Sequence, residues 1–133
     1  MSLKMTAAQM VEDARARIDE VETKDLIAQL ADEDVVIVDI RDIRERQRGH
    51  IPGSVHAPRG MIEFWVDPDS PYHKPVFAQD GKRYEFHCAS GWRSALTVAT
   101  LQDMGFDAAH LREGFSTWEA QGGPVEVPKP KDR

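Results

Sequence analysis

The sequence predicts an α/β fold, in which helices cover both faces of a mainly parallel central sheet. Segments rich in β-branched residues alternate with helical patterns along the 133 residues, and this alternation is typical of parallel sheets. The segment Val35–Ile40 is almost continuously apolar, as expected for a strand that is covered on both faces. A loop that begins at Cys88 joins a strand-like segment to an amphipathic helix, and sites of parallel sheets lie at such strand ends.

The remaining elements follow in order along the chain. A helix from Thr6 to about Ala16 begins at an N-cap threonine, and a second helical pattern covers Glu22 to Leu30. After the buried strand we expect a charged helix, an edge strand within a turn-rich loop, a short helix, an irregular excursion, a strand, a helix, a strand, a short helix and a frayed tail. Their ranges, in that order, are Ile43–Arg48, Gly49–Pro58, Gly60–Val66, Asp67–Asp80, Lys82–His87, Arg93–Met104, Ala108–Leu111, Phe115–Ala120 and Glu126–Arg133.

Composition excludes several classes of function. The formal net charge is −6, whereas a nucleic-acid partner normally requires a basic face. The longest apolar stretch, Val35 to Val38, is far too short to cross a membrane, and no signal-peptide pattern is present. The single cysteine cannot form an intramolecular disulfide, and the five histidines lack metal-ligand spacing on any one element. We therefore expect a cytoplasmic, single-domain protein with no metal and no cofactor.

The single cysteine, Cys88, is the first candidate for chemistry, and it precedes the loop residues Ala89 to Arg93. A thiolate near a helix N-terminus is stabilised by unpaired N–H groups and by the helix dipole. Gly91 lets successive N–H groups turn inward around an anion, and Arg93 can add a forked positive charge. The alternative is an inert, buried thiol beside an ordinary turn. His87 is expected on the opposite face of its strand, which disfavours it as a general base.

Three segments together resemble a rhodanese-type sulfurtransferase domain. They are Val38-Asp39-Ile40-Arg41 with Gly49-His50-Ile51-Pro52-Gly53-Ser54, then Cys88-Ala89-Ser90-Gly91-Trp92-Arg93-Ser94, then Gly105-Phe106 through Leu111-Arg112-Glu113-Gly114-Phe115-Ser116-Thr117-Trp118. The resemblance covers most of the chain, so we expect a rhodanese-like domain at 18–124. A tag remnant and an extra helix would occupy 1–17, and a flexible tail 125–133. The resemblance also implies the rhodanese-like three-layer fold around a parallel sheet.

The resemblance further implies that Cys88 carries sulfur as a persulfide. Its thiolate would take sulfur from a donor such as thiosulfate and pass it to a thiol, to cyanide or to a sulfur-accepting protein. Trp92 would either shape the mouth of the pocket or pack over the loop, while Arg93 would bind the sulfonate end of the donor. The loop residues expected to bind substrate or oxyanion are Ala89, Ser90, Gly91, Trp92 and Arg93, and the supporting residues are Asp39, Arg41, His50 and Ser94.

Two alternatives remain at the level of the sequence. A cysteine phosphatase also places a cysteine before an arginine, but such phosphatases have five intervening residues, whereas Cys88 and Arg93 have four. A catalytically silent rhodanese-like module would bind a protein partner, with the N-terminal helix as a docking or dimer surface; such modules usually lose the cysteine. The physiological donor and acceptor, the oligomeric state and any contribution of His56 stay open.

Overall fold

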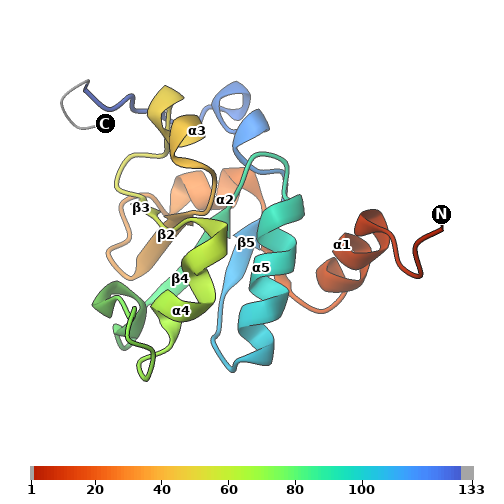
Figure 1. The fold of residues 1–133 in the computed structure, drawn as a ribbon. Helices are drawn as coiled ribbons and strands as arrows, with labels where there is room; N and C mark the ends of the chain where they lie inside the picture. The colour runs from red at the N-terminus through yellow and green to blue at the C-terminus, as the bar shows by residue number, and fades with distance from the viewer. Residues whose placement is uncertain (1, 130–133) are drawn as a thin grey trace.

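The computed structural model describes residues 2–129 and shows a five-stranded sheet with helices on both faces (Figure 1). Every strand pair in this sheet is parallel, and the strand order is β1-β5-β4-β2-β3. The predicted α/β class with a parallel sheet is therefore confirmed. The strands are β1 Asp19–Val21, β2 Val35–Asp39, β3 Val55–His56, β4 Arg83–His87 and β5 Ala109–Leu111.

The helices form two layers, one on each side of the sheet. Helices α4 and α5 cover one face, with α1 on the outer side of α5, while α2 and the last 3-10 turns cover the other face (Figure 1). The α-helices are α1 Ala7–Arg15, α2 Thr23–Ala28, α3 Ile43–Arg48, α4 Ile62–Val66 and α5 Trp92–Asp103; the 3-10 turns are Arg59–Met61, Pro75–Ala78, Phe115–Thr117 and Glu119–Gln121. Within residues 2–129, no helix is both long enough and apolar enough to cross a membrane.

Strand β2 contributes to the hydrophobic core on each face of the sheet, as its apolar run predicts. Val38 lies in the core beneath α4 and α5. Its neighbour Ile37 lies in the core of the other face, with Leu26 and Trp118. Because successive side chains of a strand point to opposite faces, a strand buried on both sides needs an apolar residue at almost every position.

Helix α1 begins where the sequence predicts it. The Thr6 hydroxyl accepts a hydrogen bond from the backbone N–H of Gln9 at 3.1 Å, and the Gln9 side chain accepts one from the Thr6 N–H at 2.8 Å. This reciprocal capping box satisfies two backbone donors that the helix leaves unpaired. Val11 and Ala14 then pack with Ala95 of α5 in a small core of their own. The N-terminal helix is therefore docked on the outside of the domain, as expected.

Two segments differ from the sequence-based expectations. β1 was not predicted, because its three residues, Asp19 to Val21, are too few to show a strand pattern. Phe115–Ala120 forms two 3-10 turns rather than one short helix. Within the expected flexible tail, which begins at residue 125, Glu126 exchanges two backbone hydrogen bonds with His50, each 2.9 Å long. Residues 130–133 of that tail lie outside the described part of the chain.

Candidate active site

Cys88 lies immediately after β4, at the carboxyl edge of the sheet. Side chains alternate along the strand, so Phe86 and Cys88 face the α5 layer, where both belong to its core. Cys88 is only 1% exposed. The sulfur therefore sits at the base of the loop that leads into α5, where the sequence places the candidate nucleophile.

Backbone donors of the loop converge on the sulfur. The N–H of Gly91 lies 3.2 Å from Cys88 Sγ and the N–H of Ser94 lies 3.4 Å from it. The Ser94 hydroxyl is also close, with Oγ 3.5 Å from Sγ. Ser94 is in the first turn of α5, whose leading N–H groups have no intrahelical acceptors. The loop and the helix start together place positive dipole ends around Sγ, which favours a negatively charged sulfur.

The carbonyl groups of the same loop point elsewhere. The N–H of Phe115 donates to the carbonyl of Cys88 at 2.8 Å, and the N–H of Ser116 donates to that of Ala89 at 2.9 Å. These bonds fix the peptide planes, so that the loop can present N–H groups to the sulfur while its carbonyl groups are satisfied by the segment after β5.

Gly91 is required by this close packing. Its φ is +90°, in the left-handed region that favours glycine. A Cβ built on Gly91 would overlap the carbonyl oxygen of Arg112. Backbone thus lies directly against backbone at this position, and no side chain fits between the loop and the chain that follows β5.

Arg93 forms a two-pronged ion pair with Glu45 of α3. Its two terminal nitrogens donate to the two carboxylate oxygens of Glu45 at 2.9 and 3.0 Å. The hydrogen bonds from Arg93 lower the pKa of Glu45, and burial opposes this only partly. The pKa of Arg93 is raised, chiefly by Glu45 and to a smaller extent by Cys88. Arg93 is thus electrostatically coupled to the thiol, but Glu45 already occupies two of its donors.

Asp39 and Arg41 form a buried clamp beneath the loop. Arg41 donates to both carboxylate oxygens of Asp39, at 3.0 and 2.9 Å, and to the carbonyl of Gly49 at 2.8 Å. Its guanidinium also lies 4.2 Å from the centre of the Phe115 ring. Burial alone would raise the pKa of Asp39, but the hydrogen bonds and charge of Arg41, together with His87, lower it to about 2. The pair connects the end of β2 to the loop at Gly49 and to the segment at Phe115. Such contacts hold loops in place, so they favour a structural role for Asp39 and Arg41.

The histidines close to the loop in sequence make other contacts. His87 faces away from Cys88 and stacks near Phe115, with ring centres 5.9 Å apart, and burial lowers its pKa to about 4. His56 Nε2 lies 2.7 Å from the carbonyl oxygen of Arg41, and His50 pairs through its backbone with the C-terminal segment. Residues 2–129 contain no group of three or more His, Cys, Asp or Glu side chains that could hold a metal ion.

Sequence reasoning missed a further set of side chains that reaches the thiol through Ser94. Ser94 Oγ lies 2.8 Å from Nδ1 of His110, and His110 Nε2 lies 2.9 Å from a carboxylate oxygen of Glu20. Arg15 Nε donates to the same oxygen at 2.8 Å. The signal available in the sequence was His110 within a predicted strand; β1, which contributes Glu20, was not predicted at all.

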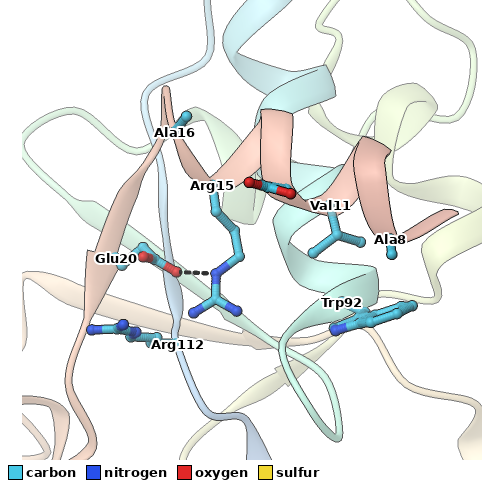
Figure 2. A pocket seen from close by; sticks show the side chains of 8 residues that line it. Ala8, Val11, Arg15, Ala16, Glu20, Trp92 and Arg112 are labelled. Atoms are coloured by element: carbon cyan, nitrogen blue, oxygen red, sulfur yellow. Dashed lines mark hydrogen bonds and ion pairs between the residues drawn. The ribbon is translucent and has the colours of Figure 1, made fainter. Parts of the chain in front are cut away.

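A pocket of about 500 Å³ lies beside the loop, between α1, β1 and the start of α5 (Figure 2). Trp92 stands on its wall with nearly half of its surface exposed, so it borders an opening rather than filling the core. Glu20 and Arg15 face each other on another wall (Figure 2). The residues that line the pocket are Ala8, Val11, Glu12, Arg15, Ala16, Glu20, Trp92 and Arg112.

Comparison with known proteins finds close similarity in sequence and in structure. A sulfurtransferase from Allochromatium vinosum is 31% identical over 114 residues, which are 84% of this chain and 98% of the relative. The thiosulfate sulfurtransferase GlpE from Pseudoalteromonas translucida is 33% identical over 89 residues, 66% of this chain and 76% of the relative.

A solved structure from Rhodopseudomonas palustris has a TM-score of 0.90 and 48% identity, and the match covers 95% of this chain and 98% of that one. It is described as a "Protein of Unknown Function" and "Possible Tyrosine Phosphatase". The family model described as "Rhodanese-like domain" matches residues 22–121. The chain therefore belongs to the rhodanese-like domain family.

Proposed function

We propose that this protein is a sulfurtransferase that carries sulfane sulfur on Cys88. The observation that carries the proposal is the convergence of the Gly91 and Ser94 N–H groups on Sγ, at 3.2 and 3.4 Å. Donors that are already oriented stabilise negative charge on sulfur, first in the thiolate and then in a persulfide anion. The sulfurtransferases among the relatives support the same conclusion.

In the first half-reaction the Cys88 thiolate attacks the outer sulfur of a donor such as thiosulfate. A new sulfur–sulfur bond forms to Sγ, the bond between the two donor sulfurs breaks, and sulfite leaves with the bonding electron pair. This is covalent catalysis in which the enzyme stores the transferred atom. The loop N–H groups then face the charged sulfur of the persulfide.

In the second half-reaction a thiolate, cyanide or a thiol of an accepting protein attacks the outer sulfur of the persulfide. The bond to Sγ breaks, and Cys88 leaves as a thiolate that the same N–H groups stabilise. The pocket beside Trp92 is open to solvent and adjoins the loop, which makes it a suitable approach for such an acceptor (Figure 2). With one cysteine in the chain, no disulfide partner competes for the persulfide, and a reducing compartment such as the cytoplasm suits the reaction.

Arg93 is the proposed binding residue for the sulfonate end of the donor. A guanidinium has five N–H donors, and the pair with Glu45 uses one donor on each terminal nitrogen. The remaining donors can bind an oxyanion, and Glu45 sets the orientation of the group. Glu45 also lowers the net positive charge that a dianionic donor meets, so donor affinity is limited by this ion pair.

A phosphatase is the second candidate, and the description of the Rhodopseudomonas palustris structure favours it. The loop argues against it, because only four residues separate Cys88 from Arg93 and the thiol is almost fully buried. A ring of this size has less room for a tetrahedral phosphate with three bound oxygens. Cys88-dependent hydrolysis of p-nitrophenyl phosphate would favour the phosphatase and count against the sulfurtransferase.

The test is the release of sulfite when the purified protein is mixed with thiosulfate in the absence of an acceptor. We expect a burst of sulfite that is stoichiometric with protein, followed by turnover to thiocyanate once cyanide is added. Cys88→Ser and protein alkylated at Cys88 should give neither. Sulfite release by Cys88→Ser at the level of the parent would contradict the proposal, and a folded protein inactive with thiosulfate and other sulfane donors would favour the binding-module alternative.

A further inference from the structure

The structure contains a continuous chain of side chains that runs from the buried thiol to solvent. It begins at Cys88 Sγ, passes through the Ser94 hydroxyl at 3.5 Å, and continues to Nδ1 of His110 at 2.8 Å. It ends at the carboxylate of Glu20, 2.9 Å from Nε2 of His110. Three different elements, α5, β5 and β1, supply the members after the cysteine.

The direction of each hydrogen bond follows from the charge of Glu20. Burial would raise the pKa of Glu20, but hydrogen bonds from His110 and Arg15 outweigh it and hold this pKa below its ordinary value. Glu20 is therefore ionised and can only accept, so His110 must donate from Nε2. Burial lowers the pKa of His110, which leaves its Nδ1 unprotonated and able to accept a proton.

Ser94 consequently donates its hydroxyl proton to Nδ1 of His110 and can accept from the Cys88 thiol. We propose that these residues form a proton relay, in which His110 takes up the proton of the Cys88 thiol through the Ser94 hydroxyl. The S–H proton moves to Oγ as the hydroxyl proton moves to Nδ1. No net hydrogen is lost, and the products are a thiolate, an unchanged hydroxyl and an imidazolium paired with Glu20.

The relay answers a physical difficulty of the site. Cys88 is 1% exposed and His110 is fully buried, so the thiol is shielded from bulk water, and the loop N–H groups that stabilise a thiolate cannot accept its proton. After transfer, the Ser94 hydroxyl donates to the thiolate and accepts from the imidazolium, whose charge Glu20 balances. The charged groups that face His110 are Glu20 from β1 and Arg15 from α1, and these two are paired with each other.

The outer end of the relay opens into the pocket beside the loop. The Glu20 side chain is 23% exposed and lies on the pocket wall opposite Trp92, next to Arg15 (Figure 2). Both Glu20 and Arg15 precede residue 22, where the match to the family model begins. The outer end of the proton path therefore lies just before the segment that matches the family model, whereas Cys88, Ser94 and His110 lie within it.

This inference rests on the proposed function only in that Cys88 acts as a thiolate nucleophile. The test is the rate of alkylation of Cys88 by iodoacetamide, measured across the pH range in which cysteine and histidine titrate. His110→Gln keeps polar groups in place but cannot take up a proton, and Ser94→Ala interrupts the relay. We expect either variant to shift the midpoint of the alkylation profile to higher pH by about one unit, equal to about tenfold slower alkylation below the midpoint.

Glu20→Gln should shift the midpoint in the same direction by less, because the amide still accepts from His110 but does not balance its charge. The double variant of Ser94 and His110 should shift it no further than either single variant, since the two act in series. His73→Gln is the matched control. Within residues 2–129 the His73 ring makes one hydrogen bond, to the carbonyl of Trp65 at 3.0 Å, and the alkylation midpoint of this variant should equal that of the parent.

A midpoint unchanged in folded His110→Gln would overturn the relay, with folding checked by circular dichroism and thermal melting. If His110→Gln does not fold, unchanged midpoints in both Ser94→Ala and Glu20→Gln would overturn it equally. Alkylation needs no sulfur donor, so the two proposals fail separately. If the parent releases sulfite normally but the variants keep the parental alkylation midpoint, only the relay proposal is refuted. If the midpoints shift but the parent transfers no sulfur, only the sulfurtransferase proposal is refuted.

Discussion

Replacement of Gly91 by alanine tests whether the loop owes its shape to direct contact between two backbones. Gly91 has φ of +90°, and a Cβ there would overlap the carbonyl oxygen of Arg112. Gly105, at the other end of α5, has a nearly equal φ of +87° but no atom within 4 Å of the same Cβ position. The pair of variants therefore separates the conformational cost from the steric one.

The magnitude follows from these two contributions. An alanine held in the left-handed region costs about 1 to 2 kcal/mol, and this applies to both glycines. Gly91→Ala must in addition displace either the loop or the strand end, and overpacking of this kind costs about 1 to 3 kcal/mol more. We expect Gly91→Ala to lose about 3 kcal/mol of unfolding free energy, and Gly105→Ala to lose only the first part.

Urea unfolding measures the stability of both variants, and sulfite release from thiosulfate measures their activity. Gly91→Ala should also lose most of its sulfite burst, because the backbone N–H of residue 91 would move away from Cys88 Sγ. Gly105→Ala should keep the burst. Equal losses of stability in the two variants, or a full burst from Gly91→Ala, would refute the close-contact explanation of the loop.

The remaining predictions concern the ion pair between Arg93 and Glu45 and the buried imidazole of His87. Glu45→Gln should lower the KM for thiosulfate about two- to fivefold, because it frees Arg93 from a half-exposed ion pair; an unchanged KM would count against the role of that pair. Arg93→Ala should raise the same KM while changing the unfolding free energy by no more than about 1 kcal/mol, since its ion pair is half-exposed. Burial lowers the pKa of His87 from 6.5 to about 4, so its neutral form stabilises the folded state fully above pH 6.5 and loses that contribution as the pH falls toward 4. Between pH 6.5 and 4 the unfolding free energy of His87→Gln, measured with urea, should therefore fall by about 3 kcal/mol less than that of the parent. An identical dependence of unfolding free energy on pH in the two proteins would contradict the argument.

The fold was largely predictable because its central features are local in sequence. The buried strand β2 is an uninterrupted apolar run, and α5 combines a wide apolar stripe with a glycine at each end. Cys88 could be singled out because it is the single cysteine and stands where a parallel strand meets a helix. Each of these features is contained in fewer than about twenty consecutive residues, the length of an ordinary strand–turn–helix unit.

The parts that could not be predicted depend on contacts between distant segments. Glu20 and His110 are 90 positions apart, and Arg93 and Glu45 are 48 apart. Such pairs have no spacing rule, because the strand order of the sheet brings them together. The sequence also does not reveal β1, and without that strand nothing places Glu20 beside β5. The pairing of Glu126 with His50 escaped prediction for the same reason, since a polar tail carries no pattern that marks its partner.

The intact mass of the protein, measured before and after incubation with thiosulfate, tests the central claim most directly. We predict the gain of one sulfur atom, reversed by a reductant and absent from Cys88→Ser. Sulfur gain in that variant would place the chemistry elsewhere in the chain. No gain in the parent with thiosulfate or other sulfane donors, together with a native fold, would contradict the assignment of Cys88 as a sulfur carrier.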